Sequence, residues 1–251
     1  MALATSVTGA SISPRKILDM PLWNAQDLDF DVDAVLRGQG ADPGVIRARS
    51  PRLVEIAERA LEEGRALLQP QTLFRELDVE ALHHERLVLD SGLFLSGELV
   101  SDHLGPAERV VLILCTVGDT LEANAAEVSK ENIVYGLALD GVGSAAVEAL
   151  ANAACKHFED RAEEHGLQSS IPISPGMVGW PVDEGQPEIF EILEPPQIDV
   201  RLTEYGLMIP RKSLTMVLGF GPMMKTSGRT CDYCAMRETC RYQDHYDTAR
   251  A

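Results

Sequence analysis

Three cysteines lie close together near the C-terminal end of the sequence, and their spacing is typical of a metal site. Two residues separate Cys231 from Cys234, and Cys240 follows after five more. The two-residue spacing lets two thiolates bind one metal ion from a single turn, while the third returns after a short loop. The pattern therefore predicts a metal-binding, cysteine-rich tail at residues 229–251.

Two kinds of metal centre fit this spacing. His245 would complete a tetrahedral zinc site as the fourth ligand. Three thiolates can equally hold an iron-sulfur cluster, with a fourth ligand that is not cysteine or with one open iron. Unligated thiols that are clustered and exposed would oxidise readily, which favours ligation. We expect an iron-sulfur cluster, and zinc is the alternative that the spacing leaves open.

A second candidate site is the loop Ser174-Pro175-Gly176-Met177-Val178-Gly179-Trp180-Pro181. Its two glycines accept positive φ angles and its two prolines restrict the chain, so its backbone groups are held rigidly. A rigid loop suits ligand recognition. It equally suits a buried crossover in which Trp180 is an ordinary core anchor. Both interpretations stay open from the loop alone.

The order of motifs around this loop resembles the activation domain of cobalamin-dependent methionine synthase. Gln186 follows the loop, and residues 200–220 then read VRLTEYGLMIPRKSLTMVLGF. The resemblance is clearest from about residue 137 to residue 221. Within the second segment, the residues that carry it are Leu202, Thr203, Glu204, Met208, Pro210, Lys212, Ser213 and Gly219.

The resemblance implies a binding site for S-adenosylmethionine, because in that family the corresponding loop lies beside this ligand. Glu204 would lie near the ligand or on the face that docks the corrin. Glu148, within the small-residue segment 137–157, would correspond to an acidic residue that binds the ligand's amino group. Arg211 and Lys212 are further candidates for contacts with the corrinoid periphery. The loop residues so implicated are Ser174, Pro175, Gly176, Met177 and Trp180, together with Gln186.

Two positions depart from the family pattern. Pro172 stands where the family has an arginine, and Met177 stands where it has a tyrosine. Without the arginine, the ligand's carboxylate loses a charged hydrogen bond worth about 1.5 to 3 kcal/mol. We therefore expect S-adenosylmethionine to bind more weakly or in another geometry.

The resemblance implies reductive activation of a corrinoid protein or a cobalamin-dependent methyltransferase. The protein would position S-adenosylmethionine or an electron donor over the cobalamin of that partner, with flavodoxin or ferredoxin as the electron source. No catalytic side chain is assigned, and any enzymatic role would belong to that methyltransferase system. Two alternatives remain. One is an iron-sulfur electron-transfer or docking subunit that does not use S-adenosylmethionine, and the other is a zinc-stapled structural adaptor.

The charge of the chain limits its partners. The 251 residues include 39 acidic and 22 basic side chains, which give a formal net charge of -17. Such a charge repels nucleic acid and anionic lipid. The sequence starts without the pattern of a signal peptide, and we expect no apolar run of the roughly 20 residues that a bilayer requires. These features predict a cytoplasmic protein with neither nucleic-acid nor membrane partners.

The residue pattern predicts an α+β fold in which helices flank a twisted, mostly antiparallel sheet. Asp90-Ser91-Gly92 is typical of a hairpin turn. The apolar run 110–114 predicts a strand buried on both faces, with an unreactive Cys115 at its end. The segments expected in the sheet lie near Leu87, Val110, Val200 and Leu214.

Helix signals and composition divide the chain into three parts. Ser50-Pro51 predicts the start of a helix that ends near Pro70, and Pro187 predicts the start of another that ends before Pro195. His83, His84 and His103 are expected at surface or hairpin positions. We expect a flexible arm at residues 1–16, the α+β domain at 17–228 and the metal-binding tail at 229–251.

Overall fold

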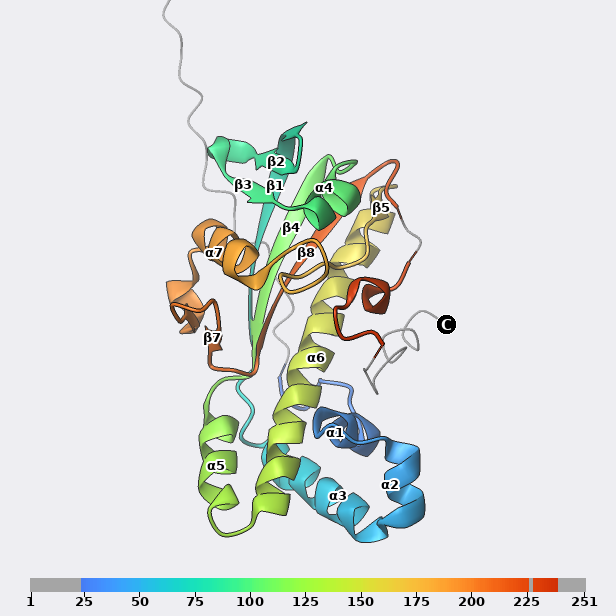
Figure 1. The fold of residues 1–251 in the computed structure, drawn as a ribbon, viewed down its shortest axis with the longest axis vertical. Helices are drawn as coiled ribbons and strands as arrows, with labels where there is room; N and C mark the ends of the chain where they lie inside the picture. Colours follow the sequence, from blue (N-terminus) through green and yellow to red (C-terminus); the bar gives the residue numbers. More distant parts are fainter. Residues whose placement is uncertain (1–23, 226–227, 239–251) are drawn as a thin grey trace, which may run out of the picture.

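The computed structural model describes residues 24–225 and 228–238. Its centre is a six-stranded sheet with the order β3-β2-β1-β4-β8-β5, and every neighbouring pair is antiparallel (Figure 1). A separate two-stranded sheet pairs β6 with β7. The strands are β1 (Gln71–His83), β2 (Arg86–Leu89), β3 (Phe94–Ser96), β4 (Arg109–Thr116), β5 (Gln168–Ser169), β6 (Arg201–Leu202), β7 (Met208–Ile209) and β8 (Ser213–Gly221).

Helices cover both faces of the large sheet, and the fold is the α+β class expected from the sequence. The α-helices are α1 (Val32–Gly38), α2 (Pro43–Arg49), α3 (Pro51–Arg65), α4 (Glu98–Leu104), α5 (Thr120–Ser129), α6 (Ile133–Glu164) and α7 (Val182–Leu193). The described residues also form the short 3-10 helices η1 (Asp90–Gly92), η2 (Pro195–Ile198) and η3 (Thr230–Tyr233). In Figure 1, α6 runs along one side of the sheet and α7 lies on the other.

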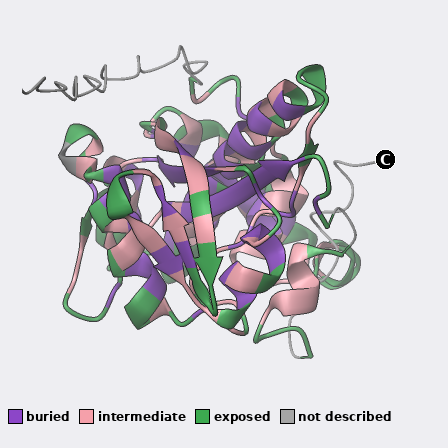
Figure 2. Cartoon of the chain, turned by 90° about the horizontal axis from the view of Figure 1, so that it is seen from above, coloured by how far each residue is buried: buried purple, intermediate pink, exposed green. Residues whose placement is uncertain are grey.

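Strand β4 explains why both faces need a cover. Its side chains alternate between two hydrophobic cores, and those of residues 110–115 are fully buried. Val111 and Ile113 belong to the core that α6 covers, whereas Val110 and Leu112 belong to the core with α4 and α7. Buried residues therefore concentrate along the central strands and the inner sides of the helices (Figure 2).

The small residues of α6 let other helices approach its backbone closely. A β-carbon on Gly141 would lie 2.7 Å from the carbonyl oxygen of Val35 in α1, and one on Gly38 would lie 2.5 Å from the carbonyl oxygen of Gly141. Gly64 of α3 packs in the same way against Leu139 and Val142. The N-terminal helices therefore contact α6 where a larger residue would not fit.

Helix α6 is also long and apolar enough, by its 32 residues and composition alone, to cross a membrane. No such segment was expected from the sequence, because the charged Asp140 and Glu148 interrupt the apolar residues. In its most apolar window, 56% of the residues are buried within the protein. The central helix of a packed core meets the same criteria, and α6 contacts α1, α3, α5 and β8.

Two features of the sheets differ from the sequence prediction. The segment near Val200 forms β6, which pairs with β7 in the small sheet rather than joining the large one. Strand β1 was not expected, because charged residues interrupt its apolar pattern. Those charges have partners distant in sequence: Glu76 pairs with Arg161 of α6, and Asp78 pairs with Arg109 of β4.

Two further expectations are wrong in detail. Helix α7 begins at Val182, five residues before the predicted start at Pro187, because the carbonyl of Pro181 accepts a hydrogen bond from Gly185 and opens the first turn. His103 is buried in α4 and only 2% exposed, although it was expected at the surface. By contrast, the helix at Pro51 and the hairpin at Asp90-Ser91-Gly92 agree with the prediction.

We predict that Gly141→Ala destabilises the protein by about 1–3 kcal/mol, because the added methyl overpacks the contact with Val35. Equilibrium unfolding in urea measures this change. Gly44→Ala is the matched control, since Gly44 is exposed in helix α2 and the only atom of the described residues near an added methyl is Oδ1 of the capping Asp42, at 3.3 Å. It should leave stability unchanged or raise it by about 0.5–1 kcal/mol. Equal effects of the two substitutions would contradict the close packing of α1 on α6.

Candidate functional site

The loop from Ser174 to Pro181 connects the edge of the sheet to helix α7. Ile173, just before it, bridges Val217 of β8 through two backbone hydrogen bonds. Within the loop, the amide of Gly176 donates to the carbonyl of Trp180 at 2.7 Å, and the amide of Trp180 donates to Met177 at 3.0 Å. Gly176 and Gly179 have φ angles of 99° and 87°, as their glycines allow. The loop is a closed, internally bonded turn.

Trp180 anchors this loop in the core that α4 and α7 cover. Its side chain is fully buried. Gly185 of α7 approaches so closely that a β-carbon there would lie 2.4 Å from the indole Nε1. Gly97, before α4, is also tight against the indole, and the amide of Leu99 donates to the carbonyl of Gly179. Burial therefore makes Trp180 a support beneath the loop.

Gln186 is a second buried support. It is only 6% exposed, and its Oε1 accepts a hydrogen bond of 3.0 Å from the hydroxyl of Thr215 in β8. This bond ties the first turns of α7 to the centre of the sheet. Both Trp180 and Gln186 are buried, whereas Gly176 and Val178 of the loop are exposed and Met177 is half-buried against the same core.

The turn between β6 and β7 meets the loop at Val182. A β-carbon on Gly176 would lie 3.1 Å from one methyl of Val182, and one on Gly206 would lie 3.3 Å from the other. Glu204 is exposed in this turn. Both segments carry exposed apolar side chains: Val178 of the loop is 61% exposed, and Tyr205 and Leu207 of the turn are 74% and 62% exposed. The sequence resemblance named Glu204 but not this apolar rim.

Glu148 lies on a different element from the loop group. It is on α6 with its side chain exposed, while the neighbouring Val147 and Leu150 are buried. The loop itself is held by contacts from α4, α7 and β8. Exposure removes the desolvation cost that a carboxylate would meet among the small residues of this helix.

The cysteine-rich tail packs directly onto the loop. Met177 and Cys234 form an antiparallel bridge, and the amide of Val178 donates to the carbonyl of Tyr233 at 2.8 Å. Cys231 and Cys234 are partly buried. Cys240 and His245, the other predicted metal ligands, lie outside the described residues. Within 24–225 and 228–238, no three ligand side chains converge on one point.

The two other described cysteines lie in the core. Burial raises the pKa of the Cys115 thiol to about 12, which keeps it protonated and unreactive as expected. Cys155 of α6 is also buried, and its sulfur lies 3.5 Å from the sulfur of Met216. Neither thiol belongs to the tail.

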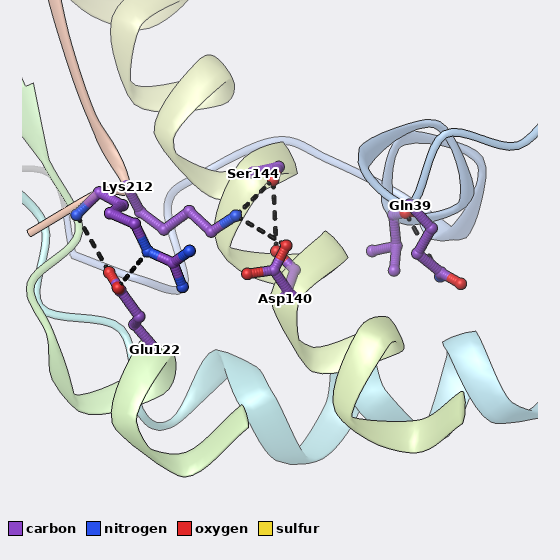
Figure 3. A network of polar contacts seen from close by, with 7 residues as sticks. Gln39, Glu122, Asp140, Ser144 and Lys212 are labelled. Atoms are coloured by element: carbon purple, nitrogen blue, oxygen red, sulfur yellow. Dashed lines mark hydrogen bonds and ion pairs between the residues drawn. The ribbon is translucent and has the colours of Figure 1, made fainter. Parts of the chain in front are cut away.

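Arg211 and Lys212 are both engaged in ion pairs (Figure 3). The Nζ of Lys212 lies 2.9 Å from Asp140 and 2.9 Å from the hydroxyl of Ser144, both on α6. Arg211 binds Glu122 of α5 through its backbone amide and its guanidinium. These contacts fix the start of β8 against two helices, which is a structural role that the sequence alone did not indicate.

His103 joins the tail to α4, and sequence reasoning missed it. Its ring meets the Tyr233 ring edge-on with 4.5 Å between centroids, and its Nδ1 has no described hydrogen-bond partner. Burial lowers the pKa of His103, the charge of Lys225 lowers it further, and Asp102 opposes this effect. A buried histidine at helical spacing has no distinctive signal in a single sequence.

Comparison with known proteins gives one informative result. No protein-family model and no curated protein matches the chain. Among solved structures, the chain is similar to the MetH reactivation domain bound to AdoHcy, which is S-adenosylhomocysteine. The similarity has a TM-score of 0.58 and 15% sequence identity, and it covers 81% of this chain and 74% of the other. The chain therefore has the fold of that reactivation domain, as the sequence resemblance predicted.

We predict that acid weakens the docking of the tail through His103. Its lowered pKa means that the folded protein holds the neutral ring while an exposed histidine, with a pKa of about 6.5, takes up a proton. Stability from the neutral ring is thus present above about pH 6.5 and falls as the pH drops towards the lowered pKa. Unfolding measured across this pH range should show a steeper loss for the wild type than for His103→Phe. Identical pH profiles would contradict this role for His103.

Proposed function

We propose that the protein reactivates a corrinoid protein or a cobalamin-dependent methyltransferase. The observation that carries this proposal is the likeness of its fold to the MetH reactivation domain with bound AdoHcy. The Ser174–Pro181 loop would present S-adenosylmethionine, or an electron donor, to the corrin of the partner. The protein's contribution is to bind, orient and exclude competing reactants rather than to supply a catalytic side chain.

The surface beside the loop suits a large ligand with an apolar face. Val178 of the loop and Tyr205 and Leu207 of the β6–β7 turn are the exposed apolar rim, and the two segments approach each other where Gly176 and Gly206 both pack against Val182. Exposed apolar side chains that gather at one place mark binding surfaces. Gly176 and Met177 lie beside this rim, so the loop backbone would contact the ligand. Glu204, in the adjacent turn, would contact the ligand or the corrin-docking face.

The roles of the remaining candidates follow from their burial. Ser174 and Pro175 begin the loop and shape it, while the buried Trp180 and Gln186 position it from beneath. The exposed carboxylate of Glu148 would bind a ligand amino group. Pro172 and Met177 replace an arginine and a tyrosine of the family pattern, so affinity for S-adenosylmethionine should be modest.

The reaction in this proposal balances with one electron and one methyl group. Cob(II)alamin gains an electron to give cob(I)alamin, which takes the methyl group of S-adenosylmethionine to give methylcobalamin and S-adenosylhomocysteine. Flavodoxin or ferredoxin would be the source of the electron. Cys231, Cys234 and Cys240 would hold an iron-sulfur cluster, or with His245 a zinc ion; a cluster supplies electron transfer, whereas zinc supplies only structure.

A second function is an electron-transfer or docking subunit that binds the corrinoid protein without S-adenosylmethionine. The bridge between Met177 and Cys234 favours it, because it joins the tail to the surface proposed for the corrin. A zinc-stapled adaptor would share that surface without redox chemistry. A cytoplasmic location, with no nucleic-acid or membrane partner, remains part of both proposals.

We predict that AdoHcy binds to the full chain and that Gly176→Ala weakens this binding by about tenfold or more. The φ angle of 99° at Gly176 is strained for alanine, so the loop would change shape at a cost of about 1–3 kcal/mol. Isothermal titration with AdoHcy and with S-adenosylmethionine measures both affinities.

Gly166→Ala is the control, because Gly166 also has a positive φ, of 71°, and nothing lies near its potential β-carbon. It should bind AdoHcy as the wild type does. If millimolar AdoHcy and S-adenosylmethionine produce no heat with the wild type, the methyl-transfer proposal is wrong and the docking function replaces it. If both variants bind equally, Gly176 is not part of the site.

A further inference from the structure

The turn that carries Cys231 and Cys234 is joined to the candidate loop through the backbone. The carbonyl of Tyr233, between the two cysteines, accepts the amide of Val178 at 2.8 Å. The next residue, Cys234, forms the bridge with Met177. Any change in the conformation of this turn therefore reaches two loop residues beside Gly176, the half-buried Met177 and the exposed Val178.

Tyr233 also anchors the turn from its other side. Its ring packs edge-on against the buried ring of His103 in α4, and α4 receives the loop through the bond from Leu99 to Gly179. Tyr233 of the tail therefore contacts both the loop and α4. Its backbone carbonyl bonds to the loop at Val178, and its side chain packs against His103 of α4.

The turn itself is small. Helix η3 has four residues, and the amide of Cys234 donates to the carbonyl of Cys231 at 3.3 Å. Asp232 accepts the amide of Arg229 and lies 3.3 Å from Arg237, which is exposed. A single 3-10 turn with partly exposed ion pairs has little stability of its own.

Metal ligation would add stability to this turn. Two thiols in a Cys-x-x-Cys turn can bind one soft metal ion, and each loses its proton when it does so. Ligation fixes the distance between the two residues that enclose Tyr233. Because such binding energy acts as folding energy, the turn would be ordered when metal is bound and loosened when it is removed.

We infer that metal ligation at Cys231 and Cys234 sets the conformation of the Ser174–Pro181 loop, with Tyr233 as the positioning residue between them. This inference deepens the proposed function, since it makes presentation of the loop to its ligand depend on the metal. The tail is then a metal-responsive support for the binding surface, whether or not it also carries electrons.

The test uses the full chain, purified without oxygen and treated with a chelator, before and after addition of Co²⁺ as a spectroscopic probe. Thiolate absorption reports binding of the metal, and hydrogen exchange reports protection of the Val178 amide. We expect exchange of this amide to slow by about tenfold or more when Co²⁺ binds. Tyr233→Ala should bind Co²⁺ but lose the added protection, and Tyr233→Phe should keep it.

Matched variants separate ligation from other effects of substitution. Cys234→Ser should lose both Co²⁺ absorption and the added protection. Ala235→Ser, which places the same hydroxyl at the next, exposed position, should retain both. The inference is overturned if the wild type binds no Co²⁺, or if Co²⁺ binds without changing exchange at Val178.

Affinity for AdoHcy, measured in the same samples, distinguishes this inference from the proposed function. Tighter binding with Co²⁺ than without it is the expected result. Equal affinity for AdoHcy with and without Co²⁺ would contradict the metal dependence of the site but would not contradict the corrinoid function. If AdoHcy binds in neither state but metal still protects the Val178 amide, the metal dependence of the loop is supported and the methyl-transfer function is wrong.

Discussion

Burial of the large sheet on both faces is the constraint on which the rest of the structure depends. Strand β4 places apolar side chains in two separate cores, so helices must cover each face. Helix α6 covers one face and α7 covers the other. The chain must therefore pass around the edge of the sheet between them, and the Ser174–Pro181 loop is that passage. Its position follows from the packing of the sheet before any ligand is considered.

The edge crossing also explains why so many elements meet at one loop. Ile173 holds the loop to β8, Trp180 fixes it in the second core, and Tyr233 of the tail covers it from outside. Ile173 and Trp180 are fully buried, while Gly176 and Val178 are exposed. Rigid support beneath a partly exposed backbone is what preorganised binding of a ligand requires.

The sequence allowed the fold class, the central strand β4, helix α3 and the hairpin at Ser91 to be predicted, because each has a local signal. Strand β1 has none, since Glu76 and Asp78 depend on arginines that are distant in sequence. The loop at Gly176 was selected as a candidate site from its glycines and prolines. The contact between His103 and Tyr233 could not be predicted, because the two residues lie 130 positions apart and neither residue type marks a site by itself. The roles proposed for Cys240 and His245 remain predictions from spacing.

The most direct test of the corrinoid function follows the absorption spectrum of cob(II)alamin, without oxygen, in the presence of the chain, S-adenosylmethionine and a low-potential reductant. The account predicts that the full chain accelerates the appearance of methylcobalamin together with an equal amount of S-adenosylhomocysteine. A rate equal to that of the same mixture without the protein would contradict methyl transfer. A spectral change of cob(II)alamin without methylcobalamin would instead identify a docking or electron-transfer subunit.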